Sequence, residues 1–273
     1  MRRCGVSDPF LIDGPAVISF SGGRTSGYML RRILDAGLQP DCHVLFANTG
    51  KERPETLAFV REVSARWGVE IHWLEYGRGE IDPATASTEG EPFDLLIAKK
   101  KMLPFPRGRF CTSVLKIGMF SQYMNAHGHE WWTNVAGIRA DEPSRVATMM
   151  APPDDPKKQT WDNYLPLART AIGVADVTAF WLNQPFDLGL RPGDGNCDLC
   201  MLKGVTLRQS MMRQWPNASK WWADHEAKIG ATFRPDTPGY AALQDGVNRS
   251  PLLPWATADE VDPTDLGDCI CHD

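Results

Sequence analysis

Several features that define common protein classes are missing from this sequence of 273 residues. No run of 18 apolar residues is present, which excludes a membrane-spanning helix. No apolar segment follows Arg2 and Arg3, so no signal peptide is expected. Positive charge is in deficit, and the net charge of −5 argues against a surface coated for nucleic acid. We therefore expect a cytoplasmic protein without a membrane partner.

The two common phosphate-binding motifs, Walker A and Gly-x-Gly-x-x-Gly, are absent as well. The sequence instead has Ser-Gly-Gly-x-Thr-Ser after the apolar residues 16–20. Two adjacent glycines let the backbone approach a ligand, and the first turn of a following helix offers unpaired N–H groups and partial positive charge. An ordinary glycine turn between a strand and a helix is the alternative. The phosphate-binding candidates are Ser21, Gly22, Gly23, Arg24, Thr25 and Ser26.

Strands and helices alternate along the first half of the chain. Apolar runs at residues 42–47, 69–76 and 130–138 predict buried strands, and residues 163–167 are a further candidate. Strand–helix–strand units with short links predict a parallel, twisted α/β sheet with right-handed crossovers and ligands at the carboxyl ends of the strands. Helices are predicted at 25–36, 54–67, 92–103, 113–126, 174–183, 205–214 and 218–229.

Two segments have the composition of irregular structure. Residues 77–92 are polar and predict a mobile loop, and the chain from Thr232 onward is rich in Pro, Gly and Asp and predicts a loose tail. The run Lys99–Lys101, with Arg107 and Arg109, is either a local basic groove or a solvated face.

Four segments in order resemble the phosphoadenosine phosphosulfate (PAPS) reductase family of the PP-loop ATP pyrophosphatases, which split ATP between the α and β phosphates. The resemblance covers roughly the first 170 residues, and each segment alone is a weak signal. The segments are residues 21–26, Asn48-Thr49-Gly50-Lys51-Glu52-Arg53-Pro54-Glu55-Thr56, Phe110-Cys111-Thr112-x-x-Leu115-Lys116, and Gly137-Ile138-Arg139-Ala140-Asp141-Glu142.

The resemblance implies an adenine nucleotide α-hydrolase-like, Rossmann-type fold. We expect a nucleotide-binding α/β domain at 1–170 and a helical, cysteine-containing region at 171–273, packed as one unit. ATP or a related adenine nucleotide, with Mg²⁺, would bind at residues 21–26. The resemblance also implies a pocket lined by Asn48, Thr49 and Gly50, with Arg139 and Arg145 facing phosphate or substrate. Lys116 is expected to help the loop and the arginines neutralise charge during catalysis. The two arginines alternatively form ion pairs with Asp141 and Glu142.

Seven cysteines without an export signal indicate reduced thiols and favour metal or redox chemistry. Cys111 and the Cys197-x-x-Cys200 pair resemble, in arrangement, the three-cysteine sets of PP-loop enzymes that thiolate tRNA or modify DNA. Three thiolates hold a [4Fe–4S] cluster with one iron open, or zinc; free redox-active thiols are the remaining reading. Cys269 and Cys271 are candidate persulfide carriers, a fourth ligand, or bystanders. Cys4 and Cys42 are expected to be structural.

Three functions remain open from the sequence. The first is an ATP-using sulfur-transfer enzyme that acts on a nucleic acid or a small molecule. The second is a sulfonucleotide reductase that uses Cys269 or Cys271 as nucleophile. The third is a nucleotide-binding subunit of a modification complex without turnover of its own. The intact Ser-Gly-Gly-x-Thr-Ser core favours the first. A sulfur-donor protein and a second copy of the chain are possible partners.

Overall fold

A six-stranded sheet lies at the centre of the computed structural model, which describes residues 8–153, 159–195 and 197–249. The strand order is β4-β3-β2-β1-β5-β6, and every neighbouring pair is parallel except β3 with β4. This arrangement confirms the predicted α/β fold class. The strands are β1 (Ala16–Ser19), β2 (Cys42–Asn48), β3 (His72–Glu75), β4 (Gly79–Ile81), β5 (Trp132–Ala136) and β6 (Trp161–Tyr164).

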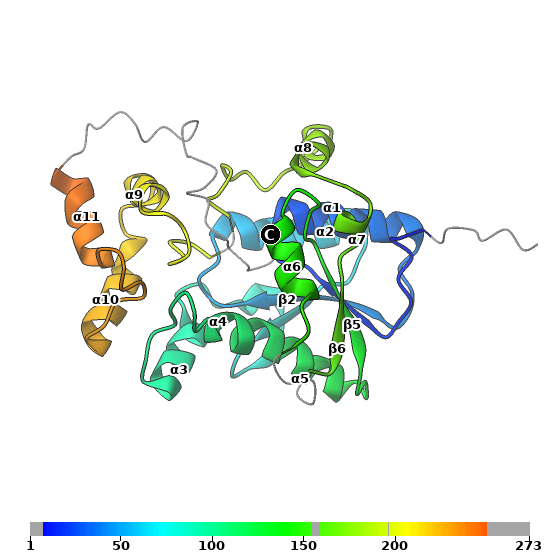
Figure 1. Ribbon diagram of the computed structural model, residues 1–273, viewed down its shortest axis with the longest axis horizontal. Helices are drawn as coiled ribbons and strands as arrows, with labels where there is room; N and C mark the ends of the chain where they lie inside the picture. Colours follow the sequence, from blue (N-terminus) through cyan, green and yellow to red (C-terminus); the bar gives the residue numbers. More distant parts are fainter. Residues whose placement is uncertain (1–7, 154–158, 196, 250–273) are drawn as a thin grey trace, which may run out of the picture.

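Helices cover both faces of the sheet (Figure 1). One face carries α1 (Arg24–Ala36) and α2 (Pro54–Trp67), with α8 (Val174–Leu182) packed outside α1, and the other carries α5 (Gly118–Ala126). None of the helices in the described part of the chain has the length and apolar character needed to cross a bilayer. The other helices are α3 (Glu91–Lys100), α4 (Phe110–Thr112), α6 (Pro143–Met150), α7 (Pro166–Arg169), α9 (Val205–Gln214), α10 (Ser219–Ile229) and α11 (Tyr240–Arg249). A short 3₁₀ turn lies at Pro83–Thr85, and a π-helical segment, Ser113–Ile117, joins α4 to α5 without a break.

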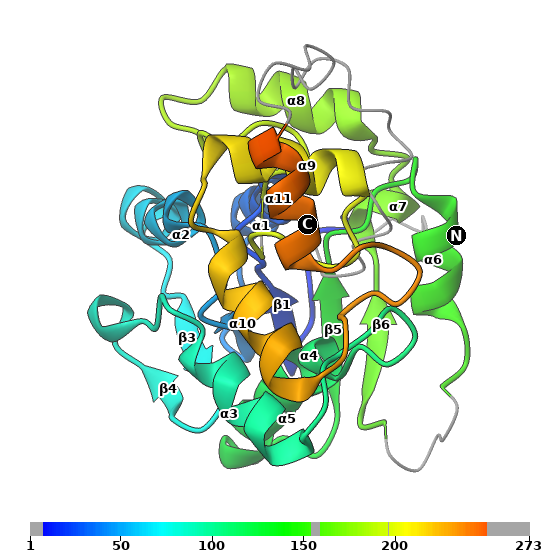
Figure 2. The ribbon, with the colours of Figure 1, turned by 90° about the vertical axis from the view of Figure 1, so that its left-hand side faces the viewer.

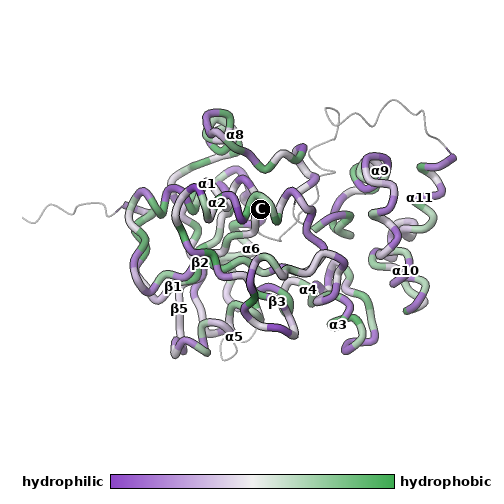
Figure 3. Tube along the Cα trace, turned by 180° about the vertical axis from the view of Figure 1, so that it is seen from behind, coloured by the Kyte–Doolittle hydropathy of each residue, from purple (hydrophilic) through white to green (hydrophobic). Residues whose placement is uncertain are grey.

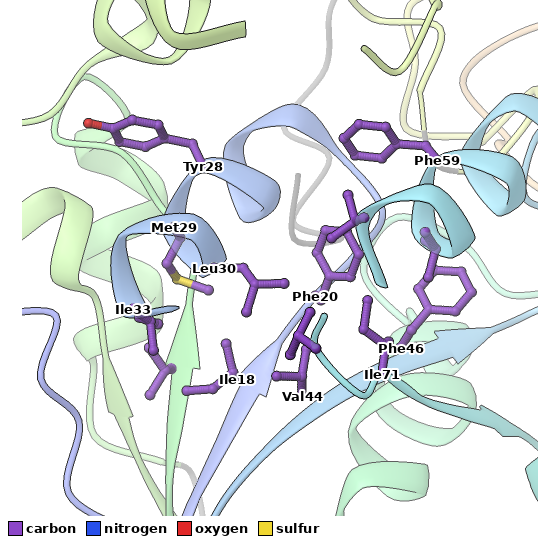
Figure 4. Packing of buried hydrophobic residues seen from close by; sticks show 14 of the residues in the cluster. Ile18, Phe20, Tyr28, Met29, Leu30, Ile33, Val44, Phe46, Phe59 and Ile71 are labelled. Atoms are coloured by element: carbon purple, nitrogen blue, oxygen red, sulfur yellow. The ribbon is translucent and has the colours of Figure 1, made fainter. Parts of the chain in front are cut away.

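Alternate residues of β1 serve two separate cores, as the two-residue period of a strand requires. Ile18 packs with α1 and α2, and Figure 4 shows it meeting Leu30 and Ile33 of α1. Val17 points to the opposite face and packs with Met119 and Met124 of α5. Val17 and Ile18 are both fully buried, so the strand is covered on both sides.

A third core joins the C-terminal helices to the rest of the molecule. Phe93 and Leu96 of α3 pack with Trp222 of α10 and Tyr240 of α11. Helices α9, α10 and α11 lie together beyond one end of the sheet (Figures 1 and 3). Residues on both sides of position 170 therefore share a core, and the division into two domains at that position stays a prediction.

Two predictions about the irregular segments were wrong, and one helix was missed. Residues 77–92 contain β4, a short antiparallel edge strand held against β3, and the turn Pro83–Thr85. The region after Thr232 contains α11, whose Tyr240 is completely buried, because packing against α10 and α9 overrides its flanking Pro and Gly residues. Helix α6 was not anticipated after Asp141, although Pro143 stands in its first turn, where proline is favourable.

Candidate functional site

The β1–α1 loop stands where the sheet reverses its direction of growth. From β1 the chain adds β2 and β3 on one side and β5 and β6 on the other. The carboxyl ends of β1 and β5 therefore form the switch point at which open α/β sheets bind ligands. The loop that follows β1 is the predicted phosphate loop, and the loop that follows β5 carries Arg139.

Hydrogen bonds within the loop hold its serines inward. The Ser26 hydroxyl lies 2.9 Å from the Ser21 hydroxyl and donates to the Gly23 carbonyl at 3.0 Å. Gly22 has φ +79°, and a Cβ there would lie 2.7 Å from Cγ2 of Thr56 in α2. Gly23, the N-cap residue of α1, has an extended conformation and offers no side chain to cap the helix. The N-cap residue therefore leaves the first-turn N–H groups of α1 to other partners, and such groups suit a phosphate.

The β5–α6 loop brings two arginines to this edge. Arg139 Nη1 donates to the Thr25 hydroxyl at 3.1 Å, and its Nε donates to Asp141 at 2.9 Å. Arg145 is buried and contacts Glu142, while its Nε and Nη2 have no hydrogen-bond partner among the described residues. For Arg139, ion pairing and contact with the phosphate loop therefore occur together. Buried guanidinium N–H groups without acceptors suit an anionic ligand.

The side chain of Arg24 pairs with a carboxylate of the segment after α8, and its role in phosphate binding stays a prediction. Its guanidinium forms a two-point ion pair with Asp187, and its backbone carbonyl accepts a hydrogen bond from Trp181 Nε1 at 2.8 Å. Burial raises the pKa of Asp187, but hydrogen bonds from Arg24 and the Gly189 amide bring it below its ordinary value. The ion pair of Arg24 with Asp187 thus links α1 to the segment after α8.

The β2–α2 loop is built around two buried polar side chains. Asn48 donates to Glu75 at 2.7 Å and to the Ser87 carbonyl at 2.8 Å, and its own oxygen accepts the Gly50 amide. The amide and hydroxyl of Thr49 both donate to Glu52 at 2.8 Å. Asn48 therefore positions the loop from inside the protein, and Thr49 is the residue of this set that reaches the neighbouring cysteines.

The three predicted metal-ligand cysteines line one pocket. Cys111 comes from α4, and Cys197 and Cys200 from the loop before α9, with Thr49, Lys116 and Trp222 also in the lining. The Thr49 hydroxyl lies 3.6 Å from the Cys197 sulfur, and Glu52 pairs with Cys197 through the backbone. The structure thus brings together thiols that are 86 to 89 residues apart in sequence.

Lys116 connects this pocket to the phosphate loop. The lysine is buried and lines both the cysteine pocket and a second pocket formed by Ser19, Ser21 and Ala47 at the ends of β1 and β2. A single cation is therefore shared by the two predicted sites.

A buried ion pair that the sequence did not reveal supports the cysteine loop. Asp198 accepts from Trp222 Nε1 at 2.8 Å, pairs with Lys51 Nζ at 3.2 Å, and donates its amide to the Lys51 carbonyl at 2.7 Å. Burial raises the pKa of Asp198, against the opposing effect of Lys51. Lys203 Nζ donates to the Cys197 carbonyl at 3.1 Å. The sequence signal was the acidic residue inside Cys-x-x-Cys, but its lysine partner lies far away along the chain.

In the part of the chain that the structure describes, the pocket includes neither the remaining cysteines nor a metal-binding arrangement of side chains. Cys4, Cys269 and Cys271 lie outside the described residues. Among the residues that are described, no three His, Cys, Asp or Glu side chains stand in a metal-binding arrangement. Cys42 is a buried structural cysteine, as expected, and burial raises the pKa of its thiol to about 11.

A mostly parallel sheet with helices on both faces, and with a glycine loop and arginines at its switch point, defines a protein of the doubly wound α/β class. The model of the phosphoadenosine phosphosulfate reductase domain matches residues 15–170, more than half of the chain. The chain therefore belongs to the phosphoadenosine phosphosulfate reductase domain family, which confirms the resemblance seen in the sequence.

Individual proteins are similar to the chain to different degrees. It is 35% identical over 208 residues to the uncharacterized nin region protein ORF290 of Escherichia phage lambda, a match that covers 69% of this chain and 66% of that protein, just under two thirds. The PAPS reductase of Candida auris, in its phosphate complex, has a TM-score of 0.43 at 16% identity, with 64% of this chain and 78% of that chain covered. The U34-tRNA thiolase NcsA of Methanococcus maripaludis, with its [4Fe-4S] cluster, gives 0.42 at 13% identity, with 92% and 79% covered.

Proposed function

We propose that this protein is an ATP-using sulfur-transfer enzyme of its family. ATP binds with its phosphates at residues 21–26, and the cysteine pocket supplies sulfur to an acceptor activated by the nucleotide. The observation that supports this proposal most is the position of Lys116, which lines the pocket at Ser21 and the pocket of Cys111, Cys197 and Cys200. Activation of the acceptor by ATP and delivery of sulfur to it would thus take place on the two sides of Lys116.

The nucleotide step follows from the charges at the sheet edge. An oxygen of the acceptor attacks the α-phosphorus of ATP, the bond to the bridging oxygen breaks, and pyrophosphate leaves with that electron pair. The acceptor oxygen then carries AMP and is a good leaving group. Negative charge on the phosphates is stabilised by the first turn of α1, by Lys116 and by the buried N–H groups of Arg145, together with bound Mg²⁺.

The cysteine set fits a soft metal centre by its chemistry. Three thiols line one pocket, with the buried lysines Lys51 and Lys203 beside the loop that carries two of them. Asp198 compensates the charge of Lys51, which leaves Lys203 as the cation beside this loop that favours thiolate ligands. A cluster held by Cys111, Cys197 and Cys200 would require the thiols to turn toward a common point, and it would supply an open coordination position for sulfide.

Sulfide is the co-reactant of the second step. Its sulfur attacks the activated carbon or phosphorus of the acceptor, and the bond to the adenylated oxygen breaks. AMP leaves with that oxygen, so no oxidant or reductant is needed. The chain's own residues hold the adenylated acceptor and the sulfur on opposite sides of Lys116 and exclude water.

A calorimetric titration tests whether ATP binds at residues 21–26. ATP should bind the full chain with Mg²⁺ present, and Gly23→Val should abolish binding because its side chain blocks the approach to the first turn of α1. Arg145→Gln should weaken ATP binding about tenfold or more, whereas Arg169→Gln, an exposed arginine on α7, should leave it unchanged. Normal ATP binding by Gly23→Val would refute this placement.

A sulfonucleotide reductase is the second candidate, and membership of the PAPS reductase domain family favours it. That enzyme would take PAPS in place of ATP and attack its sulfur with Cys269 or Cys271. Release of sulfite from PAPS in the presence of a dithiol, with ATP unable to compete, would establish this second function and exclude the first. ATP bound normally but never turned over would instead favour the nucleotide-binding subunit.

A further inference from the structure

One segment of this acidic protein carries only positive charge. Between residues 95 and 129 the sequence has six Lys or Arg residues and no Asp or Glu, although the whole chain has a net charge of −5. Lys116 is the buried member of this set. We call the other five the basic surface: Lys99, Lys100, Lys101, Arg107 and Arg109.

The fold gathers the basic surface at one place. Lys99, Lys100 and Lys101 end α3 and are exposed, and a tight turn closed by hydrogen bonds between Phe105 and Gly108 follows. Lys100 Nζ lies 5.9 Å from the ring centre of Phe110, which brings the end of α3 against the residue after Arg109. Figure 2 shows α3 and α4 on the same side of the molecule, next to α10.

The charges of the basic surface are not neutralised within the described residues. None of the five side chains forms an ion pair with a carboxylate there. Lys99 and Lys100 stand in the last turn of α3, where a helix dipole favours cations. Arg107 and Arg109 lie beyond the helix, so the dipole does not account for them.

Apolar side chains stand among these cations. Met102 is 41% exposed and Phe105 is 37% exposed, so both side chains are accessible beside the cations. Cations that alternate with an exposed aromatic ring are the combination that binds single-stranded nucleic acid, with phosphates on the cations and a base stacked on the ring. The cysteine pocket begins two residues after Arg109, at Cys111.

We propose that the basic surface binds the backbone of a single-stranded nucleic acid and presents one unstacked nucleotide to the cysteine pocket. The inference that this surface binds a single strand stands on its charges and exposure. The inference that it presents a nucleotide to the cysteine pocket rests on the proposed function. A nucleic acid is thereby the class of acceptor that this site takes. Duplexes fit less well, because a stacked base does not reach a pocket below the surface.

Fluorescence anisotropy with labelled oligonucleotides tests the binding. Twenty-nucleotide single strands of DNA and of RNA, and the matching DNA duplex, are titrated with the full chain at several salt concentrations. Arg107→Gln/Arg109→Gln should lower single-strand affinity about tenfold and reduce the slope of log affinity against log salt by about 1.4, the loss of two phosphate contacts. Arg61→Gln/Arg66→Gln removes two exposed arginines of α2 as the matched control and should change neither quantity.

The outcomes separate this proposal from the proposed function, because ATP binding is measured on the same proteins. Equal affinities for the two double variants, or no single-strand binding at low salt, would overturn the proposal even if ATP binds normally. Tighter binding of the duplex would overturn the single-strand assignment. The expected loss in Arg107→Gln/Arg109→Gln together with absent ATP binding in the wild type would support the basic surface and refute the proposed function. A preference between DNA and RNA identifies the source of the strand.

Discussion

The hydroxyl of Thr49 lies 3.6 Å from the sulfur of Cys197, although 148 residues separate them in sequence. Thr49 follows the carboxyl end of β2, so this contact places the cysteine loop directly on the edge of the sheet that carries the phosphate loop. Two sites that look independent in the sequence therefore form one continuous arrangement.

The ion pair of Asp198 with Lys51 should be important for stability. Asp198→Ala leaves a buried lysine without its carboxylate, and loss of one partner from a buried pair costs about 3–5 kcal/mol. The matched control is Asp35→Ala, which breaks an exposed ion pair with Arg31 and should cost about 1 kcal/mol or less. Urea unfolding of the two variants measures the difference, and equal costs would contradict the role of Asp198.

The two glycines of the phosphate loop should behave differently. Gly22→Ala should destabilise the fold by at least about 1 kcal/mol, since its φ is +79° and the added Cβ would lie 2.7 Å from Thr56. Gly23→Ala should leave the stability almost unchanged, because Gly23 has an extended backbone that any residue adopts. Thermal unfolding of both proteins checks this contrast, and a larger loss for Gly23→Ala would show that the loop conformation is different.

A cluster of histidines should make the stability depend on pH. Rings of His72, His127 and His129 lie 5.5 to 6.0 Å from that of His43. The Tyr123 hydroxyl lies 3.4 Å from His43 Nδ1, Asp41 is the carboxylate that opposes the lowering of its pKa, and Glu80 pairs with His72. Burial, followed by the three other histidines, lowers the pKa of His43 below 6.5.

The unfolded chain therefore binds this proton more readily than the folded protein does. The stabilisation is fully present above pH 6.5 and decreases as the pH falls through 6.5 toward the folded pKa. Urea unfolding between pH 5.5 and 8 should show this decrease, and His43→Gln should reduce its slope. An unchanged slope in the variant would mean that other groups cause it.

Helix α11 should be part of the core and not a loose tail. Tyr240 is fully buried and donates its hydroxyl to the carbonyl of Leu199, which lies between the two cysteines of the pair. Tyr240→Ala should therefore cost about 3–5 kcal/mol, and Tyr240→Phe, which loses only the hydrogen bond, about 1 kcal/mol. Chemical denaturation measures both, and a negligible cost for Tyr240→Ala would restore the tail interpretation.

The sequence was informative where local rules decide the structure. Helix α2 was predicted to the residue, because Pro54 begins it and Gly68 ends it in a left-handed conformation. Buried parallel strands were recognised as continuous apolar runs, and the phosphate loop from its two glycines between a strand and a helix. These signals all lie within a few residues of the feature that they predict.

Features that depend on distant partners could not be predicted. The strand β4 has three residues and exists because β3 pairs with it. Helix α11 forms against α9 and α10, and the partner of Asp198 is Lys51 in another loop. The sequence named the three cysteines of the pocket, but the position of Lys116 between that pocket and Ser21 required the structure.

Analysis of the products of ATP turnover is the most direct test of the proposal that this protein uses ATP to transfer sulfur. The full chain is reconstituted anaerobically with iron and sulfide and incubated with ATP labelled at the α-phosphate, Mg²⁺ and single-stranded RNA or DNA. We expect labelled AMP and an equal amount of pyrophosphate, which is assayed separately, with sulfur incorporated into the nucleic acid and no product from Gly23→Val. Formation of ADP and phosphate, or AMP release that is unaffected in Gly23→Val, would contradict this proposal.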